Sequence, residues 1–130
     1  MTLNDALANV LSTIHNAEQR GRRTCRSLSG STQLLAALKV LHQHHYLGEI
    51  VKEDTSRGMH LEINLLGRIN RCGAIKPRYA VTKDGFEKFE KRYLPARDFG
   101  IMVVSTQQGM MTHHDAKKKG LGGRLIAYCY

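Results

Sequence analysis

Two strand-like runs near the end of the chain constrain its fold more than any other feature. Residues 101–104 are apolar without alternation, a pattern typical of a strand that is buried on both faces, and residues 124–130 are consistent with a final strand. Between them lie a polar loop, Ser105–Gly109, and a short basic helix. Hydroxyls, amides and glycine at the end of a rigid strand pair allow close approach by a polar, anionic partner. The sequence therefore predicts a binding surface at this loop.

The first half of the chain predicts a small α/β lobe. Apolar residues at steps of three and four predict helices over residues 3–19 and 32–46, with a short strand, residues 24–28, between them. The first helix should end at Gly21, and the apolar face of the second should include His45. From Leu47 the apolar period changes to two, which predicts a hairpin that turns at residues 54–58. Two helices would then cover one face of a three-stranded sheet.

A change of composition at Gly67–Pro77 predicts a boundary between two lobes. Beyond it we expect a strand at residues 78–82, a helix at 83–94 that ends at Pro95, a strand at 99–104, a helix that begins with a capping box at Thr112–Asp115, and the final strand. The predicted fold class is α+β, with an N-terminal α/β lobe (helix-strand-helix-strand-strand), residues 1–66, and a mainly β C-terminal lobe with short helices, residues 67–130. Phe86, Phe89 and Tyr93 share one face of the third helix, which we interpret as core rather than as a base-stacking platform.

Charge is unevenly distributed along the chain. The 130 residues carry 20 Lys and Arg against 11 Asp and Glu, a formal net charge of +9 with neutral histidine. Residues 1–65 hold seven basic and six acidic side chains, net +1, whereas residues 66–130 hold thirteen and five, net +8. This asymmetry predicts a polyanionic partner that contacts mostly the C-terminal half. The alternative, a charge that serves only solubility, does not require such segregation.

Patterns that would indicate an enzyme or a metal site are weak. The chain lacks the phosphate-binding, zinc-protease and serine-hydrolase motifs. One alternative is a small hydrolase that uses Ser105, His114 and Asp115, but a helix cap already explains Asp115. His42 and His45 share a helix face, yet no third metal ligand lies nearby in sequence. We therefore expect no catalytic residues, no metal, no cofactor and no small-molecule substrate.

The cysteine count and the hydropathy predict an intracellular protein. Cys25, Cys72 and Cys129 are an odd number without short spacing, which argues against a disulfide framework and against a zinc knuckle. No run of about eighteen apolar residues and no signal-peptide pattern occur in the sequence. We therefore expect neither secretion nor a membrane partner.

RNA is the polyanion that best fits the predicted loop. No predicted helix resembles a reader of the DNA major groove, whereas hydroxyls and glycine suit the shallow minor groove of RNA. Basic residues in the turns and in the short helix would contact phosphates. They are Arg22, Arg23, Arg68, Arg71, Lys76, Lys117 and Lys118. For the arginines after the first helix, a favourable interaction with the helix dipole is the alternative explanation.

The end of the chain carries a motif whose spacing is specific. Its residues are Gly100-Ile101, Ser105-Thr106-x-x-Gly109, Met111-Thr112, Ala116, Gly122-Gly123 and Ile126-Ala127-Tyr128. Three earlier segments accompany it, Leu3–Asn9, Tyr46–Glu49 and Gly67–Tyr79. With them the chain resembles, over nearly its full length, the universal small-subunit ribosomal protein S8 family in its archaeal and eukaryotic branch.

The resemblance implies a two-lobed structural component of the small ribosomal subunit. Such a protein binds the central domain of the small-subunit ribosomal RNA early in assembly, has neighbouring ribosomal proteins as further partners, and is cytoplasmic. An extra-ribosomal regulator that binds messenger RNA through the same loop, as bacterial members can be, is the alternative function.

The resemblance also implies RNA-contacting residues. The chief family contact corresponds to Ser105, Thr106 and Gly109, with Gln107 adjacent. Further contacts correspond to Asn4 and Asp5 in the N-terminal helix and to Ser31 at the start of the second helix. The sequence departs from the family pattern at two places. Residues 107–108 are Gln-Gln, and residues 28–33 lack the proline and lysine that commonly precede the second helix.

Overall fold

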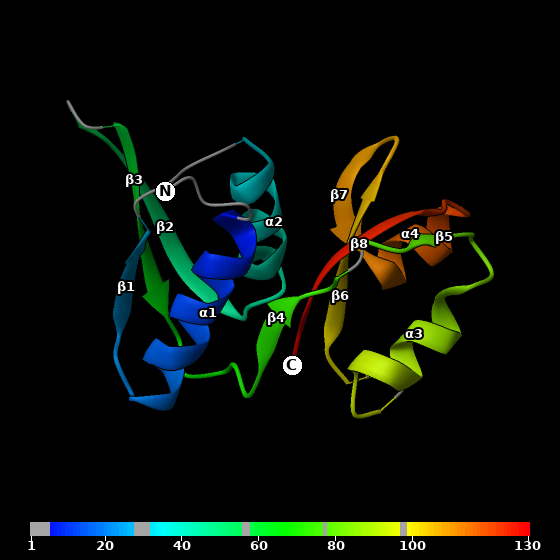
Figure 1. Ribbon diagram of the computed structural model, residues 1–130, viewed down its shortest axis with the longest axis horizontal. Helices are drawn as coiled ribbons and strands as arrows, with labels where there is room; N and C mark the ends of the chain where they lie inside the picture. The colour runs from blue at the N-terminus through cyan, green and yellow to red at the C-terminus, as the bar shows by residue number, and fades with distance from the viewer. Residues whose placement is uncertain (1–5, 28–31, 56–57, 77, 97–98) are drawn as a thin grey trace.

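The computed structural model describes residues 6–27, 32–55, 58–76, 78–96 and 99–130, and these contain four helices and eight strands (Figure 1). The elements in chain order are α1 (Ala6–Gln19), β1 (Thr24–Ser27), α2 (Thr32–Gln43), β2 (Leu47–Thr55), β3 (Gly58–Leu65), β4 (Cys72–Ala74), β5 (Ala80–Val81), α3 (Phe86–Tyr93), β6 (Ile101–Thr106), β7 (Gly109–Thr112), α4 (His113–Lys119) and β8 (Gly123–Cys129).

The strands form two antiparallel sheets. The first has the order β1-β3-β2, and the second has the order β4-β8-β6-β7 with β5 also paired to β8. Figure 1 shows α1 and α2 between the two sheets, and α3 and α4 on the far side of the second sheet. This arrangement confirms the predicted α+β class with two lobes.

One hydrophobic cluster joins the two sheets through α1 and α2. It contains Leu11 and Leu38 of the helices, Ile63 of the first sheet, and Val103 and Ala127 of the second sheet, all of them almost fully buried. The helices therefore cover one face of the three-stranded sheet, as predicted, and also pack against the second sheet. Because this cluster contains residues from both sides of residues 66–67, the proposed division into separate domains stays a prediction.

A second cluster lies on the other face of the five-stranded sheet. Phe86 of α3, Met102 and Val104 of β6, and Leu125 of β8 are fully buried there. Since neighbouring side chains of a strand point to opposite faces, Ile101–Val104 supplies residues to both clusters. This confirms that the apolar run is buried on both faces.

The second helix is shorter than the sequence predicts. It ends at Gln43, and the amides of His45 and Tyr46 donate to the carbonyls of His42 and Leu41, both at 3.0 Å. His45 has a left-handed φ of 65° and is exposed, so its predicted place on the apolar face of the helix is wrong. A residue in this conformation ends a helix rather than continuing it.

Residues 67–76 are more ordered than a linker would be. Cys72–Ala74 forms β4, which pairs with β8, and Ile69 and Ile75 are buried. The thiol of Cys72 donates to the carbonyl of Leu11 at 3.4 Å, which ties this segment to α1. The segment predicted as a boundary between lobes therefore contains a strand, because pairing with a strand distant in sequence orders it.

The boundaries of the neighbouring elements also differ from prediction. The strand predicted at residues 78–82 is only Ala80–Val81, and the helix predicted at 83–94 is only Phe86–Tyr93. Leu94 has extended backbone angles, φ −110° and ψ 146°, as a residue that precedes a proline favours. Of the aromatic face of this helix, Phe86 is core as predicted, whereas Phe89 and Tyr93 are only half-buried.

Candidate nucleic-acid interface

The predicted loop is the tight end of a hairpin. Ser105 pairs with Met110 and Thr106 with Gly109, so only Gln107 and Gln108 lie outside the strand pairing. The predicted five-residue loop is thus too long, because both strands extend into it and Gly109 begins β7. Figure 1 shows this hairpin reaching the upper edge of the C-terminal lobe.

The hydroxyl of Thr106 stabilises the turn from inside. It donates to the Gly109 carbonyl at 2.8 Å and accepts from the Gln108 amide at 3.2 Å. Its single proton is therefore already in use, and toward RNA it could act only as an acceptor. Gln107 and Gln108 are exposed and Ser105 is half-buried. Gly109 has a φ of 110°, which residues with a side chain rarely adopt.

Arg124 lies beside this hairpin and is absent from the predicted RNA contacts. In the pairing of β6 with β8 it is the partner of Ser105, and its side chain is exposed. Residues directly opposite each other in antiparallel strands project from the same face, so Arg124 adds a positive charge next to Ser105. The only signal in the sequence was a basic residue at the start of the final strand, and periodicity alone does not reveal register across strands.

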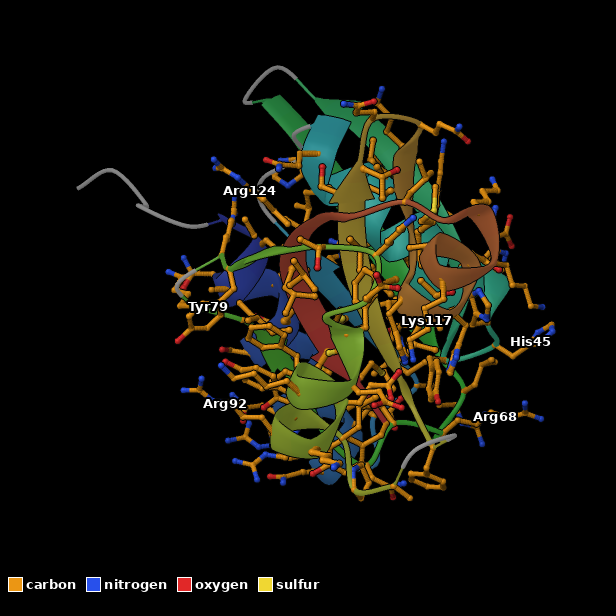
Figure 2. The ribbon with its side chains drawn as sticks, turned by 90° about the vertical axis from the view of Figure 1, so that its right-hand side faces the viewer. His45, Arg68, Tyr79, Arg92, Lys117 and Arg124 are labelled. Atoms are coloured by element: carbon orange, nitrogen blue, oxygen red, sulfur yellow. The ribbon has the colours of Figure 1, made fainter. Side chains whose placement is uncertain are left out.

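The predicted basic residues do not all lie near the hairpin end. Arg22 and Arg23 follow α1, and Arg68 follows β3; both segments lie at the bottom of Figure 1, opposite the hairpin end. Figure 2 likewise separates Arg68 from Arg124. These arginines and the hairpin end would therefore contact different stretches of a nucleic acid.

The remaining predicted contact residues differ in their exposure to solvent and in their pairing. Lys117 is partly buried and its ammonium group pairs with the carboxylate of Glu90. Lys118, Arg71 and Lys76 are exposed. The predicted contacts Asn4, Asp5 and Ser31 lie outside the residues that the structure describes.

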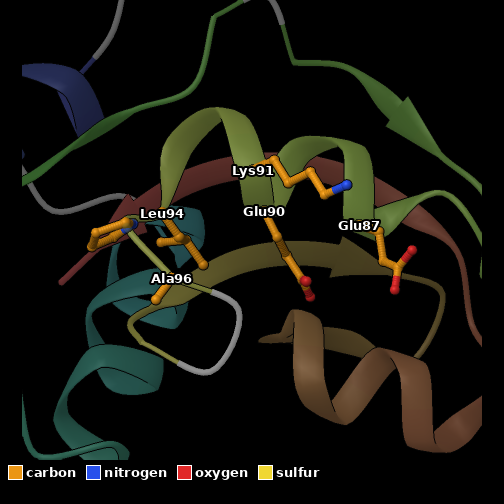
Figure 3. A pocket seen from close by; sticks show the side chains of 6 residues that line it. Glu87, Glu90, Lys91, Leu94 and Ala96 are labelled. Carbon is orange, nitrogen blue, oxygen red and sulfur yellow. The ribbon is translucent and has the colours of Figure 1, made fainter.

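A buried polar cluster lies between α3 and α4. Glu90 points from α3 toward α4 (Figure 3) and is 4% exposed. His113 is fully buried; its Nδ1 accepts from the Met102 amide at 3.1 Å, and its Nε2 lies 3.1 Å from a Glu90 oxygen. The surface hollow beside Glu90 is also lined by Glu87, Lys91 and Leu94, and its two carboxylates do not suit a contact with RNA.

The helix cap is confirmed in part, and the hydrolase alternative gains no geometric support. The Thr112 hydroxyl accepts from the Asp115 amide at 3.2 Å, which is one half of the predicted capping box. Asp115 lies 3.9 Å from Nε2 of His44. Within the described residues, no hydrogen bond joins Ser105 to His114 or His114 to Asp115.

The buried histidine makes stability depend on pH. Burial, followed by the neighbouring His114 imidazole, lowers the pKa of His113 from 6.5 to about 4. Above pH 6.5 the contribution of His113 to the free energy of unfolding does not change with pH. As the pH falls from 6.5 toward 4, the unfolded histidine takes up a proton that the folded one does not, so the free energy of unfolding should drop by about 3 kcal/mol. Urea unfolding between pH 7 and 4 measures this change.

The matched variants are His113→Gln and His44→Gln. We expect the first to lose most of the pH dependence between 6.5 and 4, and the second, which replaces an exposed histidine, to retain it. Identical pH profiles for His113→Gln and the original protein would contradict the assignment to His113.

Comparison with known proteins adds a family assignment to this geometry. A family model described as ribosomal protein S8 matches residues 5–130, a span that contains every helix and strand described above. No described helix has both the length and the apolar character needed to cross a membrane. The described part of the chain also holds no group of three or more histidine, cysteine or acidic side chains arranged to bind a metal ion.

Proposed function

The chain belongs to the ribosomal protein S8 family, and from this premise we propose that it binds the central domain of the small-subunit ribosomal RNA through the end of the β6–β7 hairpin. Membership makes it a ribosomal RNA-binding protein of the small subunit that acts in translation, in a family of structural proteins rather than enzymes. The proposed finer role is support of subunit assembly, in the cytoplasm. Its place in the archaeal and eukaryotic branch stays a prediction.

The exposed end of the hairpin carries this proposal. Ser105, Gln107 and the backbone of Gly109 offer small polar groups at the end of two paired strands, and Arg124 lies next to Ser105. Such a surface suits the shallow minor groove of RNA, where 2′-hydroxyls and base edges are accessible. The internal hydrogen bonds of Thr106 keep the turn in one conformation, which lowers the entropy that binding would cost.

Basic side chains elsewhere would hold the protein on the phosphate backbone. Arg71, Lys76 and Lys118 would do so on the C-terminal lobe, and Arg22, Arg23 and Arg68 at the opposite end of the molecule from the hairpin. Contacts to phosphates position a protein on RNA without reading its sequence. We therefore assign shape recognition to the hairpin end and general affinity to the basic side chains.

Gln107→Glu is expected to weaken binding to a central-domain RNA fragment about tenfold or more, because it brings a negative charge to the proposed contact. Gln107 is replaced rather than Gly109, since any side chain at Gly109 would strain the turn. Gln43→Glu, the same change at an exposed residue at the end of α2, is the control and should bind normally. Filter binding measures the affinities and circular dichroism the fold. Normal RNA binding by folded Gln107→Glu would exclude the hairpin end as the contact.

A further inference from the structure

A row of aromatic side chains crosses the surface of the C-terminal lobe. We define the aromatic row as Tyr79, Phe89, Tyr93, Phe99, Tyr128 and Tyr130. Ring centroids lie 5.2 Å apart in the pair Tyr79–Phe89 and 5.6 Å apart in the pair Tyr93–Tyr128. Tyr130 continues the second group at 6.3 Å from Tyr128 and at 6.3 Å from Phe99. These separations are those of interacting aromatic rings.

Cationic side chains are interleaved with these rings. The guanidinium of Arg92 lies 5.4 Å from the ring centroid of Tyr79 and 5.5 Å from that of Tyr93, so it connects the two aromatic groups. It also donates to the Tyr79 hydroxyl at 3.4 Å. The Lys88 ammonium lies 5.9 Å from the Phe89 ring. Figure 2 shows Tyr79 and Arg92 projecting along the same edge of the molecule.

The rings of the aromatic row are accessible from solvent. Five of them pack on the second cluster and are only half-buried, and Phe99 is 50% exposed. Tyr128 lies across Gly73, where a Cβ would come within 3.0 Å of the tyrosine oxygen. The absence of a side chain at residue 73 thus gives this ring its place on the sheet. The core beneath is already filled by Phe86, Met102 and Leu125, which are fully buried.

Most of the aromatic row lies away from the hairpin end. Along β6 and β8, Ser105 pairs with Arg124 at one end, whereas Ile101 pairs with Cys129 at the other end, next to Tyr130. Figure 1 accordingly shows the C-terminus at the bottom of the lobe and the hairpin end at the top. Tyr79 lies nearer the hairpin, since its carbonyl accepts from the Leu125 amide at 3.0 Å and the next residue, Ala80, pairs with Arg124. A segment stacked along the row from Tyr79 to Tyr130 would therefore run away from the hairpin end and contact rings that the hairpin end does not include.

We propose that the aromatic row is a second RNA-binding site, which stacks unpaired bases of a single-stranded segment, with Arg92 and Lys88 supplying positive charge. Aromatic rings and arginine planes are the groups on which unstacked bases are held, and stacking is tolerant of sequence. The cations between the rings favour RNA over an apolar protein surface, which would leave them desolvated without partners. This proposal rests on the proposed function only in taking RNA as the partner.

Tyrosine fluorescence reports directly on this site. The chain has no tryptophan and five tyrosines, and four of these, all but Tyr46, belong to the aromatic row. Titration with a single-stranded ten-nucleotide oligouridylate should therefore quench most of the tyrosine emission. A fully paired RNA duplex of the same length should leave the emission largely unchanged. Absence of quenching by the oligouridylate would overturn the proposal.

Variants separate this site from the hairpin. Phe99→Leu combined with Arg92→Gln keeps the tyrosine reporters and should weaken oligouridylate binding about tenfold or more. Val51→Ala, at an exposed apolar residue of the first sheet, is the matched control and should bind normally. Gln107→Glu should leave oligouridylate binding unchanged. Normal oligouridylate binding by the folded double variant would overturn the proposal.

Binding of the central-domain fragment and binding of the oligouridylate test the hairpin end and the aromatic row separately. If the central-domain fragment binds in a Gln107-dependent manner while the oligouridylate does not quench, the aromatic row is not an RNA site and the hairpin assignment stands. If the oligouridylate binds and quenches while Gln107→Glu has no effect on the fragment, the aromatic row stands and the hairpin assignment fails. Capture of a ribosomal protein by the aromatic row, with no oligouridylate binding, would assign the surface to a protein partner instead.

Discussion

Binding of the central-domain RNA fragment is expected to weaken by about a thousandfold or more when the salt concentration rises from 50 to 200 mM, provided that roughly six or more phosphates are contacted. The reason is the net charge of +8 on residues 66–130, which would displace counterions from the RNA. Filter binding at a series of salt concentrations measures the slope of log affinity against log salt.

Single variants identify which charges contribute to this slope. Arg124→Gln should reduce the magnitude of the slope by about one, the contribution of a single phosphate contact, because Arg124 lies beside Ser105 at the proposed interface. Lys52→Gln, at an exposed residue of the first sheet, should leave the slope unchanged. A slope near zero for the original protein would contradict the electrostatic argument altogether.

The second large effect is expected at Gly123, where β8 approaches β6 more closely than any side chain would allow. A Cβ at this position would lie 2.3 Å from the carbonyl oxygen of Ser105 and 2.9 Å from Cγ1 of Val104. Gly123→Ala must therefore push the strands apart and disturb their pairing. We expect the free energy of unfolding to fall by about 3 kcal/mol or more, measured by urea unfolding.

Gly120→Ala is the control for this substitution. Gly120 ends α4 with a φ of 67°, and a Cβ there would meet no atom within 4 Å. Its replacement should cost only about 1 kcal/mol, the cost of the left-handed conformation. Similar losses for the two alanine variants would show that the close approach at Gly123 has no particular importance.

The sequence predicted the elements that have a strong periodic pattern. The first helix ends before Gly21, the hairpin follows from alternation after Leu47, and the run Ile101–Val104 is buried on both faces. Each of these signals is local. By contrast, β4 and β7 are three and four residues long and are ordered by pairing with β8 and β6, so the local pattern around them was too short to predict a strand.

The candidate interface was predictable in position but not in detail. Hydroxyls, amides and glycine after an apolar strand pointed to residues 105–109, and the family motif pointed to the same residues. Sequence could not show that the Thr106 hydroxyl is used within the turn, nor that Lys117 pairs with Glu90 of a different helix. It also missed Arg124, because only the register of β6 against β8 brings that residue to Ser105.

The position of β8 in its sheet has a consequence for synthesis of the chain. β4, β5 and β6 all pair with β8, yet all three precede it in sequence. During translation these strands are synthesised before their common partner exists, whereas every strand of the first sheet is complete by Leu65. At roughly 5–20 residues per second, the N-terminal sheet therefore has several seconds to form before the hairpin that carries Ser105 acquires its neighbour. The ability to bind RNA through this hairpin would then be among the last properties that the nascent protein gains.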